Sequence, residues 1–334
     1  MRDAVVAVVL LLAPFVNGKG QADRHDQFPE LKGPYLGQDP PGVQPLLFAP
    51  GIVSTDLHDD FSPAFTPDGR EAFFRCLGND RMIILHSTLD SGRWSLPKVA
   101  PFSGVFGDLG VFVSHDGNRL FFSSNRPARD TDTTGDLDLF AVDRTAEGWG
   151  DPYCVFPSNS GSGDLLACSI DSAGTVYFYA KSSEGLGGFD LYRLRAGEGL
   201  YSSKETLPTS INTRRDETCP CIARDGSFLI YSSQGGANGN DGTGLYVAFL
   251  NPDQSWSRPV NLSRHLGMTL PAKFPGLSPD GRYLFFVVPE SKEANRRLGR
   301  KWEIEALRGA GPRAGGGNVY WVNISVLDDL RSEK

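Results

Sequence analysis

One short hairpin pattern occurs five times in this chain of 334 residues, and it constrains the fold more than any other feature. In each copy a strand enters a tight turn, usually Asp-Gly, whose glycine supplies the positive φ angle that such a hairpin needs. A second strand follows and carries a bulky pair: Phe73-Phe74, Phe121-Phe122, Tyr177-Phe178, Ile230-Tyr231 and Phe285-Phe286. These pairs are 48, 56, 53 and 55 residues apart. Periods near 50 residues are typical of propeller blades.

The rest of each repeat supplies two more strands. Third strands are predicted over 82–88, 136–143, 189–195, 244–250 and 318–324. A fourth strand follows in four copies, but the chain ends before the fifth copy can form one, and the segment PLLFAP (45–50) stands ahead of the first hairpin. We therefore expect an all-β fold. It is a five-bladed β-propeller of four-stranded antiparallel blades, closed by an N-terminal strand that completes the last blade.

The segments outside the repeats complete the predicted organisation. Residues 1–22 combine an early arginine, a short apolar run and small residues, which is typical of a secretory signal peptide. We expect an extended strap over 23–44, the propeller over 45–328 with an insertion at 289–317 in the last blade, and a C-terminal tail over 329–334. No later apolar stretch is long enough to span a bilayer. The prediction is an exported protein, periplasmic or secreted, and a monomer.

Charge and cysteine content narrow the classes of partner and site. The net charge of −7 argues against a nucleic-acid partner, because phosphate binding needs a basic surface. Five cysteines in an exported chain leave at least one unpaired, and the C-x-C at Cys219 and Cys221 lacks the second half of a zinc site. We expect the cysteines to be small buried residues on strands.

Two of the hairpins resemble a known repeat. SPAFTPDGREAFF (62–74) and PGLSPDGRYLFF (275–286) are similar to the WD40-like repeats of TolB-like propellers, a family common among exported bacterial proteins. The resemblance covers nearly the whole chain after residue 22 and implies the propeller fold. It implies no single activity, since the family includes binding and scaffolding proteins as well as enzymes. The chain shows no α/β domain ahead of the propeller, as TolB has, so the function of TolB is not expected. It also shows no α/β-hydrolase domain after the propeller and no G-x-S-x-G motif, so peptidase activity is not expected.

Four carboxylates precede the first strands of their blades at one aligned position, where the fifth blade has Ala272 beside Lys273: Asp60, Asp108, Asp164 and Glu217. Three hypotheses follow. The carboxylates accept hydrogen bonds from neighbouring backbone, or they bind a hard cation or polyhydroxylated ligand, or two of them act as acid and base on a glycoside.

Polar residues of the loops after the second strands should share that rim: Arg75, Asn125, Arg126, Lys181, Gln234 and Asn238. Directional hydrogen bonds from such side chains suit carboxylates, sugars or phosphate. Tyr179 and three tryptophans, Trp94, Trp149 and Trp256, are candidate sugar platforms, but packing between blades is the favoured role of the tryptophans.

His58, Asp59 and Asp60 form a candidate cation site. No cofactor is expected apart from Ca²⁺, which is kept as an alternative.

The absence of a nucleophile–base pair, a multi-histidine centre or a phosphate loop favours a binding module. We expect an exported propeller that recognises a protein or an oligosaccharide through its loop rim, without catalysis. The alternative is a carbohydrate-active hydrolase or lyase that uses carboxylates at the mouth of the central channel.

Overall fold

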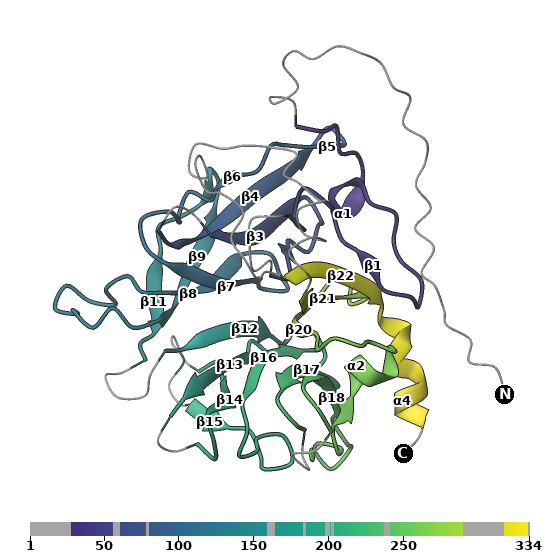
Figure 1. The fold of residues 1–334 in the computed structure, drawn as a ribbon. Coiled ribbons are helices and arrows are strands. Elements are labelled where there is room, and N and C mark those ends of the chain that lie inside the picture. The colour runs from purple at the N-terminus through teal and green to yellow at the C-terminus, as the bar shows by residue number, and fades with distance from the viewer. Residues whose placement is uncertain are drawn as a thin grey trace.

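The protein is a ring of five antiparallel β-sheets, seen in a computed structural model (Figure 1). The structure describes residues 28–55, 61–77, 80–158, 164–182, 185–197, 201, 204–236, 241–289 and 317–332, without the side chains of residues 167 and 168. Residues 1–22, which carry the predicted signal peptide, and most of the predicted insertion lie outside this part of the chain. Within it, no helix combines the length and the apolar character needed to cross a membrane.

Each sheet is one blade, and its strands are ordered from the ring centre outward. Blades 1 and 2 each contain five strands: β2 (Ala64–Phe65), β3 (Glu71–Leu77), β4 (Met82–Asp90), β5 (Arg93–Trp94) and β6 (Lys98–Val99), then β7 (Asp108–Val113), β8 (Arg119–Ser124), β9 (Asp138–Thr145), β10 (Gly148–Trp149) and β11 (Tyr153–Phe156). Blades 3 and 4 each contain four: β12 (Leu166–Ile170), β13 (Val176–Lys181), β14 (Phe189–Leu194) and β15 (Lys204–Thr206), then β16 (Glu217–Ile222), β17 (Phe228–Ser233), β18 (Gly244–Phe249) and β19 (Val260–Asn261).

Blade 5 closes the ring as the sequence predicts. It contains β20 (Lys273–Leu277), β21 (Tyr283–Pro289), β22 (Gly317–Asn323) and the N-terminal strand β1 (Leu46–Leu47). β1 pairs antiparallel with β22, so that Leu46 lies opposite Trp321. Because chain segments from both ends of the sequence form this one sheet, the exposed edges of an open ring are removed.

The bulky pairs of the second strands explain why the hairpin is repeated. Successive side chains of a strand point to opposite faces, so the first member of each pair packs against the next blade and the second against the preceding blade. Phe73 packs with Phe122 and Trp149 between blades 1 and 2, whereas Phe74 packs with Phe285 between blades 5 and 1. The other three blades follow the same rule, which gives five apolar clusters, one at each interface between blades.

The hairpin turns also follow the predicted chemistry. The glycine of each turn has φ between 68° and 82°: Gly69, Gly117, Gly174, Gly226 and Gly281. The preceding aspartate accepts a backbone N–H from two residues further on, as Asp68 does from Arg70 at 3.0 Å. The predicted fourth strands of the first two blades are split. β5 and β6, like β10 and β11, flank Pro97 or Pro152, and proline lacks the N–H that a strand ladder needs.

The predicted strap packs against the closure between blades 5 and 1. It contains a short helix, α1 (Pro34–Gly37), whose Leu36 is buried in the same apolar cluster as Phe48. The Trp94 indole donates a hydrogen bond of 2.7 Å to the carbonyl of Gly33. Among the described residues, the other helices are α2 (Leu262–His265), the 3₁₀ helix η2 (Ile324–Leu327) and α4 (Asp328–Ser332). The C-terminal segment is thus helical from residue 328 and buries Leu330, where the sequence indicates only a tail.

Candidate functional site

The central channel opens differently at its two ends. At the end that carries the hairpin turns, a cavity of about 130 Å³ is lined by turn residues such as Pro67, His115 and Gly281. At the other end two adjoining cavities, of about 170 and 430 Å³, share Leu166, Tyr179, Cys219 and Phe274. We call these two cavities the channel-mouth pocket. Their further lining includes Phe61, Arg75, Leu109, Gly110, Phe189, Asp216, Gln234 and Lys273. Of the loops after the second strands, the described part of the chain contributes Gln234 and Thr243 of blade 4 to this lining, whereas Arg75 lies within β3. That these loops share one rim stays a prediction.

Bulges in the inner strands shape this pocket. The pairing of β7, β12, β16 and β20 with their second strands shifts by one residue at the same level of the channel. Gly110, Cys219 and Phe274 occupy the bulges of β7, β16 and β20 with φ angles of 59°, 53° and 55°. Positive φ is unusual for cysteine and phenylalanine, and a bulge redirects the side chain that it carries. All three residues line the pocket.

Asp108, the first residue of β7, is fully buried rather than open to the channel. Its Oδ2 accepts a hydrogen bond of 2.6 Å from Ser103, and its Oδ1 pairs with Arg126 at 2.9 Å. The Ser103 hydroxyl accepts the backbone N–H of Ile84 in blade 1. Asp108 thus ties the connection between blades 1 and 2 to both of them, and it does not line the channel-mouth pocket.

Glu217, the first residue of β16, has the same kind of role between blades 3 and 4. It is fully buried and accepts hydrogen bonds from the backbone N–H and hydroxyl of Thr213 and from the Ser233 hydroxyl, all at 2.7–2.9 Å. Burial raises the pKa of this carboxyl, which the hydrogen bonds partly offset. Its neighbours in sequence, Asp216 and Thr218, line the pocket, but Glu217 itself does not.

Asp164 differs from the two residues with which the sequence aligns it. It is exposed, and its Oδ1 accepts the backbone N–H of Leu137, the residue before β9, at 3.0 Å. The equivalent contact in the next blade belongs to Asp216, whose Oδ1 accepts the N–H of Phe189 at 2.9 Å. Asp164 therefore corresponds structurally to Asp216 and not to Glu217. The fourth carboxylate, Asp60, lies outside the described residues.

Some of the predicted ligand-binding residues line the channel-mouth pocket and others do not. Arg75 and Gln234 line the channel-mouth pocket. Asn125 instead accepts the N–H of Gly107, and the half-buried Arg126 is engaged with Asp108, Ser124 and the carbonyl of Phe102. Lys181 is exposed and lines neither cavity. Asn238 lies outside the described residues. Trp94 and Trp149 are buried, as expected for packing between blades.

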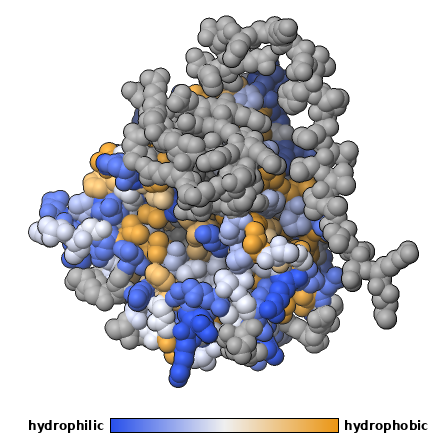
Figure 2. Space-filling view, viewed as in Figure 1, coloured by the Kyte–Doolittle hydropathy of each residue, from blue (hydrophilic) through white to orange (hydrophobic). Residues whose placement is uncertain are grey.

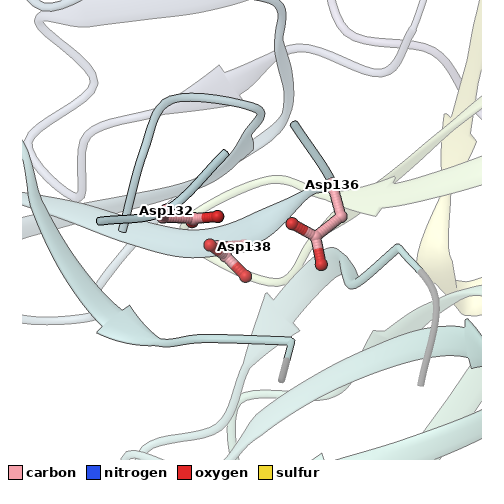
Figure 3. Close-up of side chains that lie close together, drawn as sticks. All are labelled: Asp132, Asp136 and Asp138. Atoms are coloured by element: carbon pink, nitrogen blue, oxygen red, sulfur yellow. The ribbon is translucent and has the colours of Figure 1, made fainter. Parts of the chain in front are cut away.

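The weak cation candidates His58, Asp59 and Asp60 also lie outside the described residues. Another acidic group forms on the loop before β9 and at its first residue. The carboxylates of Asp132, Asp136 and Asp138 point toward one another, within 4.8 Å (Figure 3). Burial, with repulsion from the other two carboxylates, raises the pKa of Asp138, and the N–H of Ser158 donates to it. These oxygens are of the type that a hard cation prefers, in a cavity separate from the channel-mouth pocket.

The structure describes the side chains of four cysteines. Cys76, Cys154, Cys219 and Cys221 form no disulfide, and burial raises the pKa of Cys154 and of Cys221 to about 12. A thiol with such a pKa is a poor nucleophile and a poor metal ligand at neutral pH. All four lie on strands, as expected, but only Cys219 and Cys221 are buried, whereas Cys76 and Cys154 are partly exposed.

Sequence reasoning missed most of the aromatic wall of the pocket: Phe61, Phe189 and Phe274. One signal was present, since Ala272 replaces the carboxylate at the aligned position of the fifth blade and Lys273 and Phe274 follow it. The bulge that turns Phe274 into the channel depends on pairing between strands, and no residue pattern in the sequence marks it. Figure 2 shows hydrophobic residues exposed among hydrophilic ones near the middle of the visible face.

Known proteins carry no argument about the function of this chain. No protein-family model and no curated protein matches the chain. Solved structures that it resembles include a putative TolB from Agrobacterium tumefaciens, with 16% identity, a TM-score of 0.47 and coverage of 69% of this chain and 70% of that one. TolB from Acinetobacter baumannii shares 17% identity with a TM-score of 0.40, over 59% of this chain and only 41% of its own length. The α-L-arabinofuranosidase PaAbf62A from Podospora anserina shares 11% identity with a TM-score of 0.45, over 84% and 98%.

Proposed function

We propose that this protein is an exported binding module of the WD40-like propeller type, which recognises a protein or glycan partner through the channel-mouth pocket and its loop rim. The observation that carries the proposal is the composition of the pocket. Its walls are aromatic and aliphatic side chains with a few polar groups, which is the usual character of a recognition site. The apolar run of residues 1–22 supports export.

The geometry gives less support to the carbohydrate-active alternative. Acid–base chemistry on a glycoside needs two carboxylates that the substrate can reach, at a separation set by the mechanism. Asp108 and Glu217 are fully buried, and neighbouring groups hydrogen-bond to them. Asp164 is exposed but lines neither cavity of the pocket.

The experiment compares binding by two variants of the chain over residues 23–334. Thr218→Trp fills the channel-mouth pocket, and Arg224→Ala alters the cavity at the opposite end of the channel. Each immobilised protein is offered an oligosaccharide array and an envelope extract. A ligand retained by the wild type and by Arg224→Ala, but lost from Thr218→Trp, supports the proposal. Equal retention by both variants would place binding elsewhere, and cleavage of a retained glycan would make the protein an enzyme.

A further inference from the structure

Two cations and two aromatic rings, the latter tilted by 38° to each other, form a continuous row of contacts, called the stack, across the channel-mouth pocket. The Arg75 guanidinium carbon lies 3.0 Å from the centroid of the Phe61 ring. The Phe61 and Phe274 ring centroids are 4.0 Å apart, and Lys273 Nζ lies 5.0 Å from the centroid of Phe274. Arg75 and Phe61 belong to blade 1 and the other two to blade 5, so the stack bridges the closure of the ring.

The backbone of Phe274 is held in place from both sides. Its φ angle of 55° is strained for a residue with a side chain. The Ser62 hydroxyl of blade 1 donates a hydrogen bond to the Phe274 carbonyl, and the Phe274 N–H donates to the Ser232 hydroxyl of blade 4 at 3.3 Å. Contacts from two neighbouring blades therefore fix the ring of Phe274 as a rigid wall of the pocket.

Among the described residues that line the pocket, Arg75 and Lys273 are cationic and Asp216 is anionic, so this lining is net positive although the chain as a whole carries −7. Lys273 makes no ion pair with a carboxylate among the described residues. Asp216, which also lines the pocket, has both oxygens engaged, one by the Phe189 N–H and the other by the Gln234 amide at 2.6 Å. An anion that reaches Lys273 thus meets an ammonium group beside aromatic and aliphatic walls.

We propose that the channel-mouth pocket binds an apolar or aromatic group that bears a carboxylate. This inference rests on the proposed binding function and names the chemistry of its ligand. The carboxylate pairs with Lys273, and the apolar part lies against Leu109, Leu166 and Tyr179. Two sources carry this chemistry: the C-terminal residue of a peptide and a free small carboxylic acid.

Calorimetric titration tests the proposal with four probes. N-acetylphenylalanine carries the carboxylate and its amide does not, and the peptide Gly-Ser-Gly-Phe is used with a free and with an amidated C-terminus. The proteins are the wild type, Lys273→Met and, as a matched control, Lys181→Met, since Lys181 is exposed and lines neither cavity. We expect each acid to bind at least about tenfold more tightly than its amide, because the amide cannot form the charge-assisted pair. Lys273→Met should remove that preference, and Lys181→Met should keep it.

The outcomes separate the two ligand sources and the two proposals. Tighter binding of the peptide than of the acetylated amino acid supports a chain terminus, and equal binding supports a free acid. Equal binding of acid and amide, a preference that survives Lys273→Met, or no binding of any probe would overturn this inference. If this inference fails but a ligand retained by the wild type is lost from Thr218→Trp, the proposed binding function still stands. If the wild type retains no ligand that Thr218→Trp loses, the proposed binding function and this inference both fail.

Discussion

The Trp149 indole of blade 2 donates a hydrogen bond of 2.9 Å to the carboxylate of Glu71 in blade 1. The same carboxylate accepts from His86 at 2.8 Å and pairs with Arg144. Burial raises the pKa of Glu71, but the hydrogen bonds from His86, Trp149 and Arg144 outweigh it and lower this pKa to about 2. One carboxylate therefore joins β3 and β4 of blade 1 to β9 and β10 of blade 2.

This network predicts how stability changes in acid. Because the pKa of Glu71 is lower in the folded state, its contribution is complete above the unfolded value near 4.5 and is lost as the pH falls toward 2. Glu71→Gln should remove about 2 kcal/mol of stability at pH 7 and flatten the decline below pH 4.5. Urea unfolding at several pH values measures both effects. Glu147→Gln, at an exposed turn position, serves as the control. If the stability of Glu71→Gln declines below pH 4.5 as steeply as that of the wild type, Glu71 is not the cause of the decline.

Asp108 should be architectural. Asp108→Asn leaves the Arg126 guanidinium, whose side chain is only 11% exposed, without its counter-charge. We expect a loss of about 3 kcal/mol and a clearly lower melting temperature. Asp164→Asn, at an exposed carboxylate, should change stability by less than about 0.5 kcal/mol. An Asp108→Asn protein that melts like the wild type but loses a ligand or an activity would instead return this residue to the functional site.

Closure of the ring can be tested within one short segment. Phe48 is fully buried against Phe285 and Trp321, with ring centroids 4.9 and 5.1 Å away, whereas Leu46 is 45% exposed. Phe48→Ala should cost about 3–5 kcal/mol, because it leaves a cavity at the seam of the ring. Leu46→Ala should cost less than about 1 kcal/mol. Equal losses in denaturant titrations of the two variants would mean that the buried Phe48 side chain, which follows β1, does not hold the ring closed.

The alternation of the bulky pairs predicts which substitutions interact. The Phe73 and Trp149 rings meet edge to face at 5.8 Å, whereas Phe74 belongs to the opposite interface. A double-mutant cycle of Phe73→Leu with Trp149→Phe should give a coupling of about 0.5–1.5 kcal/mol. The same cycle with Phe74→Leu should be additive within about 0.5 kcal/mol. Coupling of Trp149 to both phenylalanines alike would contradict the division into separate interfaces.

The candidate site was predictable only in part. The sequence predicts that Arg75 and Gln234 lie on the loops after the second strands; both line the pocket, but Arg75 does so from within β3. It also aligns Asp108 with Glu217, but it cannot show that their side chains turn away from the channel into the connections between blades. That choice depends on partners distant in the fold, such as Arg126 for Asp108 and Thr213 for Glu217. The equivalence of Asp164 to Asp216 likewise appears only from their backbone contacts.

The sequence by itself determined the all-β class, the five blades and the closing strand at 45–50, because hairpin turns and alternating strands are local patterns and repetition makes them visible. The tertiary structure decided what the channel contains. A bulge at one level of the inner strands places Phe274 and Cys219 in the pocket, and the packing of neighbouring blades buries two of the four predicted carboxylates. The physical reason is that the direction of a side chain at a bulge, and the burial of a charge, depend on what the adjoining blade offers to it.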